Sequence, residues 1–171
     1  KKHKHDGSNC DDWFETAVTD GCVIAVAADG AGSKRLSRIG ARLCCESAVS
    51  YLKEKLSALI AKYPTLKSAL CADMSGTEFM AACSRIAPLV QEAARKAFDN
   101  VIIHLKEIYN NEYCIEALGR NPILSDLSST FLAAIVIPLE IDGKRQCFSV
   151  TAQIGDGFIC GINSKADADS C

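Results

Sequence analysis

"WFETAVTDGCVIAVAADGAGS", residues 13–33, is the stretch from which the fold can be read. Two apolar runs, 13–18 and 22–28, flank Thr-Asp-Gly and predict two strands joined by a tight turn. The second run is almost entirely apolar, so we expect a central strand buried on both faces. It stops on Asp29, with Gly30 beside it. A carboxylate next to bare backbone indicates a metal ion, a phosphate or simply a turn at this point.

The rest of the chain predicts two helices followed by strands. Apolar residues recur at helical spacing over 34–62 and 77–110, and Pro88 should kink or divide the second helix, for which Thr77 is the expected N-cap. After a loop at 118–129 the period returns to that of strands. The predicted strands are 130–141, 145–155 and 158–163, with Asp142-Gly143 as a hairpin turn. This order predicts an α+β fold built around antiparallel hairpins.

Composition limits the function classes. The chain has 171 residues, enough for one domain, 1–171, with a sizeable core. Its formal net charge of −2 argues against bulk electrostatic binding to nucleic acid or to an acidic membrane. No apolar run approaches the ~20 residues of a membrane span. The ten cysteines contain no C-x-x-C pair, so we expect reduced, mostly buried thiols and a cytoplasmic location.

Acidic residues stand at the predicted strand ends. Asp11 and Asp12 precede the first strand, Asp29 follows the second, and Asp156 follows the strand at 145–155. Hard cations such as Mg²⁺ and Mn²⁺ prefer carboxylate, carbonyl and water oxygens, so carboxylates from neighbouring strands could hold a metal pair at one sheet edge. The alternative is that each Asp-Gly dipeptide only forms a turn.

Basic residues near these positions have two interpretations. His3 could contact a ligand or belong to a solvated basic terminus. Lys34 and Arg35 follow the glycine-containing loop and could attract a phosphate, or they could be ordinary charges in the first turn of a helix. The loop also resembles a phosphate-cradling turn before a helix, but it lacks the lysine spacing of a P-loop.

Four motifs in order resemble the metal-dependent protein phosphatase 2C family, most closely its bacterial branch. They are "H-x-x-x-G-x-x-C-D-D" (3–12), "VAADGAGS" (26–33), "SSTFLAAIV" (128–136) and "QIGDGFI" (153–159). The resemblance implies an α/β/β/α sandwich of two antiparallel sheets flanked by helix pairs. It also implies hydrolysis of phosphoserine and phosphothreonine esters by a metal-activated water.

The resemblance assigns roles to individual residues. Asp29 and Asp12 would be the catalytic carboxylates, with Asp29 bridging two Mn²⁺ or Mg²⁺ ions. Gly30 would contribute its carbonyl. Asp12, or Asp11 beside it, would bind a metal directly or through water, and Asp156 matches the aspartate linked to a third ion. The family's phosphate-binding arginine aligns with a glycine here, so His3, Lys34 or Arg35 would contact the phosphate instead.

The resemblance also sets expectations for partners and completeness. A phosphoprotein substrate and a cognate serine/threonine kinase are the expected partners. The family domain usually carries two later aspartates in D-G and D-N contexts, which Asp167 and Asp169 lack. We therefore expect the chain to be the N-terminal two-thirds of a phosphatase domain. The alternative function is a non-catalytic regulatory binding module; a plain interaction domain ranks last, because four ordered matches would then be accidental.

Overall fold

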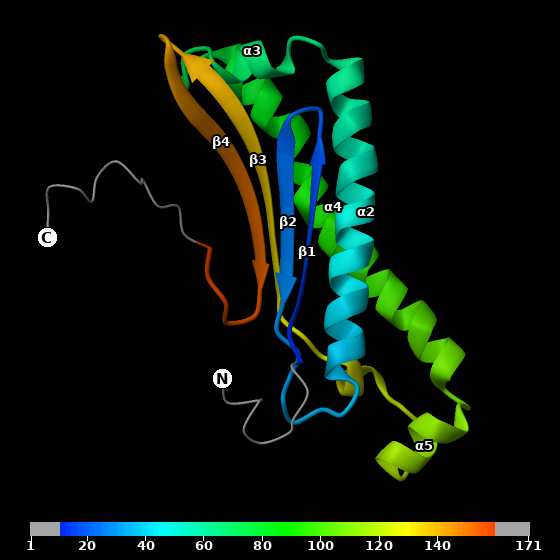
Figure 1. The fold of residues 1–171 in the computed structure, drawn as a ribbon. Helices are drawn as coiled ribbons and strands as arrows, with labels where there is room; N and C mark the ends of the chain where they lie inside the picture. The colour runs from blue at the N-terminus through cyan, green and yellow to red at the C-terminus, as the bar shows by residue number, and fades with distance from the viewer. Residues whose placement is uncertain (1–10, 160–171) are drawn as a thin grey trace, which may run out of the picture.

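The two predicted N-terminal strands form a hairpin in the computed structural model, which describes residues 11–159 (Figure 1). Strand β1 (Trp13–Thr19) pairs antiparallel with β2 (Cys22–Ala28). The turn residues Asp20 and Gly21 have φ values of 50° and 71°. Positive φ at both central residues matches the right-handed twist of the strands and favours Asp-Gly.

A second hairpin completes the sheet. Strand β3 (Phe131–Ile141) pairs with β2, and β4 (Lys144–Ile154) pairs with β3, so the four antiparallel strands follow chain order. Asp142-Gly143 forms the predicted turn, with φ values of 52° and 69°. The α+β prediction is therefore confirmed. The described residues form this single sheet, and the second sheet of the expected sandwich is not among them.

Two long helices cover one face of the sheet (Figure 1). Helix α2 (Ser37–Lys62) ends where predicted but begins three residues later than Lys34. Helix α4 (Thr77–Ile108) is continuous through Pro88, so the prediction that proline divides it is wrong. Ile86 and Val90, on either side of the proline, are buried in the core and hold both halves of the helix against the sheet.

Short helices occur where the sequence pattern was too brief to predict them. Helix α3 (Leu66–Leu70) and helix α5 (Glu112–Leu118) were not predicted, and the 3-10 helix η1 (Leu124–Leu127) lies in the predicted loop. Gly76, and not Thr77, occupies the N-cap position of α4. No strand includes residues 158–159, and residues 160–163 of the last predicted strand lie outside the described range.

The core lies between the helices and one sheet face. Strand β2 alternates: Cys22, Ile24, Val26 and Ala28 are buried against the helices, whereas Val23 on the opposite face is 40% exposed. The central position of β2 is confirmed, but the prediction of burial on both faces is wrong for the described residues, because helices cover only one face.

The seven described cysteines are all free thiols, so the prediction of reduced cysteines holds within the described residues. The other three, Cys10, Cys160 and Cys171, lie outside the described range.

Candidate metal centre

Asp12 and Asp29 lie side by side at one end of the sheet. The register pairs Trp13 with Ala28, so the residue before β1 and the residue after β2 are neighbours. Their carboxyl groups share a hydrogen bond. The structure therefore brings together the two carboxylates that the sequence singled out, while their catalytic role stays a prediction.

Gly30 allows a close contact between two segments of the chain where β2 ends. It is buried, and its N–H donates to the Asp11 carbonyl oxygen at 3.2 Å. A Cβ atom at this position would lie 2.5 Å from that oxygen, a distance that no side chain could tolerate. Glycine thus lets the chain leaving β2 lie directly against the chain entering β1, which holds Asp11, Asp12 and Asp29 within one small region.

The segment entering β3 fixes the loop that follows Asp29. The Asp29 N–H donates to the Thr130 hydroxyl at 2.9 Å, and the Thr130 N–H donates to the Asp29 carbonyl at 2.8 Å. Two residues after Asp29, the Ala31 N–H donates to the Ser128 carbonyl at 3.0 Å. The family motif at 128–136 located this segment in the sequence, but its pattern gave no sign that Thr130 would anchor Asp29.

These segments surround a pocket of about 400 Å³. Asp29 and the glycine-containing loop form one wall, Ser128–Thr130 another, and Asp156, just after β4, a third. The starts of β1 and β3 and the ends of β2 and β4 lie at the same end of the sheet (Figure 1). Antiparallel pairing therefore gathers acidic residues that are far apart in the sequence.

Among residues 11–159, the charged groups that shift the pKa of Asp29 at this end of the sheet are negative. The pKa of Asp29 is raised, first by its hydrogen bond with Asp12, then by burial, and then by the negative charges of Asp12, Asp156 and Asp11. These negative charges disfavour ionisation of Asp29 unless a cation neutralises them.

The donor chemistry of the pocket fits a hard divalent cation, since carboxylate oxygens dominate it. Within residues 11–159, however, no group of three or more His, Cys, Asp or Glu side chains is arranged so that it could hold a metal ion. The described side chains thus supply suitable donors without a completed coordination shell.

The predicted phosphate-binding residues lie elsewhere. Lys34 and Arg35 line a separate pocket of about 430 Å³ and do not line the one that contains Asp29. The Arg35 guanidinium donates a hydrogen bond to the Ala117 carbonyl, which ties it to α5. His3 lies outside the described residues. Phosphate binding by these three residues remains a prediction.

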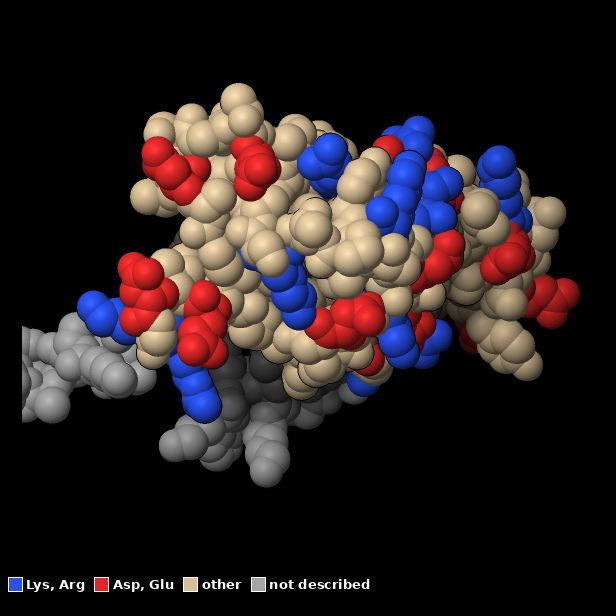
Figure 2. Space-filling view, turned by 90° about the horizontal axis from the view of Figure 1, so that it is seen from above, with Lys and Arg blue, Asp and Glu red and all other residues tan. Residues whose placement is uncertain are grey.

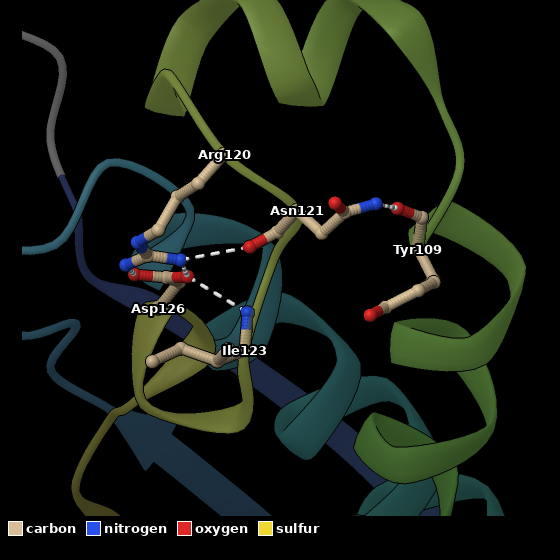
Figure 3. Close-up of polar contacts among 5 residues, drawn as sticks. All are labelled: Tyr109, Arg120, Asn121, Ile123 and Asp126. Carbon is tan, nitrogen blue, oxygen red and sulfur yellow. Dashed lines mark hydrogen bonds and ion pairs between the residues drawn. The ribbon is translucent and has the colours of Figure 1, made fainter.

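An ion pair between the buried Asp126 and the half-exposed Arg120 supports the segment that leads to Ser128–Thr130 (Figure 3). Both carboxylate oxygens of Asp126 accept hydrogen bonds from Arg120 at 2.8 Å, and the Ile123 N–H donates to Asp126 at 2.9 Å. Asp126 is only 2% exposed. Arg120 and the Ile123 amide hold the pKa of Asp126 below its usual value, because both stabilise the ionised form. The prediction of an unstructured loop did not reveal this pair.

Close packing connects this ion pair to the candidate metal centre. Residue Leu127 of η1 follows Asp126 directly, and its carbonyl oxygen lies against α2 at Gly40. A Cβ atom on Gly40 would lie 1.9 Å from that oxygen, so only glycine allows the contact. The chain then passes straight into Ser128–Thr130, the wall of the Asp29 pocket.

Charges of both signs are mixed over the outer surface seen in Figure 2. This face shows no broad basic area of the kind that binds nucleic acid. None of the helices in residues 11–159 is both long enough and apolar enough to cross a membrane.

The antiparallel sheet with its helix pair is consistent with the fold of the family that the four motifs resemble, and comparison with known families supports the same class. The profile of the protein phosphatase 2C family matches residues 1–169. The chain therefore belongs to the protein phosphatase 2C family. Comparison with curated proteins and with solved structures gave no match.

Proposed function

We propose that this protein is a metal-dependent phosphatase that hydrolyses phosphoserine and phosphothreonine esters in protein substrates. The observation that carries the proposal is the convergence of Asp11, Asp12 and Asp156 on Asp29, whose pKa is raised first by its hydrogen bond with Asp12, then by burial and by the negative charges of these three residues. Such a cluster is costly by itself and becomes favourable when cations bind. Family membership supplies the reaction class.

Asp29 and Asp12 would hold Mn²⁺ or Mg²⁺, with Asp11 and the Gly30 carbonyl as further donors and Asp156 toward a third ion. When bound, such ions lower the pKa of water and stabilise negative charge on a phosphate. The hydrogen bonds between Asp29 and Thr130 hold the Asp29 backbone in place. This backbone would therefore keep its position when the charge in the site changes. Lys34, Arg35 and His3 are proposed to contact the phosphate or the residues around it.

The finer features of the family are part of the same proposal. The sheet face opposite the helices bears Phe14 and Val18, which are 74% and 67% exposed. Large apolar side chains on a sheet face favour a covering layer, as the second sheet of a sandwich would provide. The bacterial-type branch, a cytoplasmic location and a cognate kinase remain predictions.

A non-catalytic regulatory module is the second candidate. It is favoured by the finding that, in the described part of the chain, no three potential ligands are arranged to hold a metal. The two candidate functions differ in whether the protein hydrolyses phosphate esters. With p-nitrophenyl phosphate and a phosphothreonine peptide as substrates, we expect hydrolysis that requires Mn²⁺ and stops with EDTA. No hydrolysis by the full protein would favour the binding module, and hydrolysis that persists in EDTA would contradict the metal-dependent mechanism.

A further inference from the structure

An apolar pocket of about 260 Å³ adjoins the candidate metal centre. Five elements contribute to its walls: Cys44 from α2, Ala94 and Phe98 from α4, Leu124 from η1, Phe131 from β3 and Ile154 from β4. None of the described residues that line it is charged. Its ligand must therefore be uncharged and largely apolar, because a buried charge would find no partner there.

This pocket shares part of its lining with the one that contains Asp29. Ser128, Ser129 and Ile154 line both pockets. A peptide spans about 3.3–3.6 Å per residue when extended, so a side chain close in sequence to a residue in the Asp29 pocket can reach the apolar one. The shared wall thus places an apolar space next to a polar, acidic one.

The rim of the apolar pocket exposes large hydrophobic side chains. Phe98 is 51% exposed, Ile154 57% and Leu124 39%. Three such residues around one opening form a surface that gains free energy when an apolar group covers it. Inside, Ser129 donates a hydrogen bond to the Cys44 sulfur at 3.8 Å. Burial raises the pKa of the Cys44 thiol, so this wall stays neutral and behaves as a small hydrophobic surface.

We propose that this pocket selects phosphoprotein substrates that carry a bulky apolar side chain within three residues of the phosphorylated residue. The inference rests on the phosphatase function proposed above and deepens it. The pocket exceeds the ~150 Å³ apolar cavity that accommodates a benzene ring, so it can hold a leucine or phenylalanine side chain. Its lining excludes an acidic or basic neighbour.

The test compares phosphothreonine peptides that are otherwise polar and carry one leucine, placed in turn at each of the three positions before and after the phosphothreonine. We expect kcat/KM to rise about 10-fold at one position relative to a serine peptide, which is the scale of added apolar groups in a fitting pocket. A leucine effect of less than twofold at every position would overturn the proposal.

Two variants test whether the preference for leucine arises in this pocket. Phe98→Glu places a charge on the rim, and Ala94→Leu fills the interior; each should bring the leucine-to-serine ratio close to one. The ratio is taken within each variant, so a general loss of activity cancels. Met80→Glu is the matched control, because Met80 is 59% exposed on the same helix and does not line the pocket. If both pocket variants keep the wild-type ratio, the proposal is wrong.

Measurements of peptide binding test the pocket independently of the proposed phosphatase activity. Phosphonate analogues of the same peptides cannot be hydrolysed, and fluorescence anisotropy gives their affinities. We expect the same preference for leucine and its loss in the two pocket variants. If wild-type protein fails to hydrolyse p-nitrophenyl phosphate, the phosphatase function fails. Equal affinities for the leucine and serine analogues would instead overturn the pocket assignment.

Discussion

Two carboxylates in this molecule, Asp126 and Asp29, have opposite surroundings. Asp126 is buried and accepts hydrogen bonds from Arg120 and from the Ile123 amide, and its pKa is lowered. Asp29 lies beside other carboxylates, shares a hydrogen bond with Asp12, and its pKa is raised. Within residues 11–159, Asp126 has a cationic partner, whereas the charged groups that shift the pKa of Asp29 are all negative.

The contrast separates a structural role from a functional one. A carboxylate with a cation and an amide as partners needs nothing further and stabilises the segment that holds it. A group of carboxylates whose nearest charges are of the same sign is stable in ionised form only when an external cation joins it. On this argument Asp126 maintains the wall of the pocket, and Asp29 would hold the proposed ions.

The largest expected effect is on catalysis at Asp29. Asp29→Asn keeps the shape of the side chain and removes its charge, so kcat at saturating Mn²⁺ should fall by at least about 100-fold. The melting temperature should stay unchanged or rise, because repulsion from Asp12 and Asp156 is relieved. Steady-state kinetics and a thermal melt of the same preparation measure both.

Asp142→Asn is the matched control for this experiment. Asp142 also precedes a glycine, but it forms the β3–β4 turn with a φ of 52° and lies outside the acidic pocket. We expect wild-type turnover from this variant. Near-wild-type turnover in Asp29→Asn would show that Asp29 is only a turn residue, like Asp142.

A smaller effect, on stability, is expected at Asp126. Asp126→Asn weakens charge-assisted hydrogen bonds to a buried group, which should cost about 1.5–3 kcal/mol of unfolding free energy. For a domain of this size the melting temperature should fall by roughly 3–12 °C. Because Arg120 is half-exposed, we assign the loss to these hydrogen bonds and not to long-range attraction.

The pH dependence of this stability has a definite sign. The folded-state pKa of Asp126 is lowered from 3.8, so the unfolded chain binds the proton more readily. The advantage of wild type over Asp126→Asn should be complete well above pH 3.8 and should disappear as pH falls through the lowered pKa. Urea unfolding of both proteins across this range measures it, and a difference that persists at the acid end would contradict the assignment.

Sequence patterns predicted the sheet because each hairpin combines two apolar runs with an Asp-Gly turn. Antiparallel register then places Asp12 beside Asp29, so half of the candidate centre followed from local patterns. The Arg120–Asp126 pair could not be predicted from local patterns, because its geometry arises from the packing of η1 on Gly40 and not from a spacing in the chain. Likewise, Arg35 followed the glycine-containing loop in sequence, yet its hydrogen bond to Ala117 directs it to α5.

The central claim is that the strand-end carboxylates form the cation site, and a calorimetric titration with Mn²⁺ tests it most directly. We predict that wild type and Asp126→Asn bind Mn²⁺ with similar affinity, and that Asp29→Asn loses most of the binding heat. Asp126→Asn is measured at a temperature where it is folded, so that binding and stability are not confused. Equal Mn²⁺ affinity in Asp29→Asn and wild type, or no binding to wild type, would contradict the account.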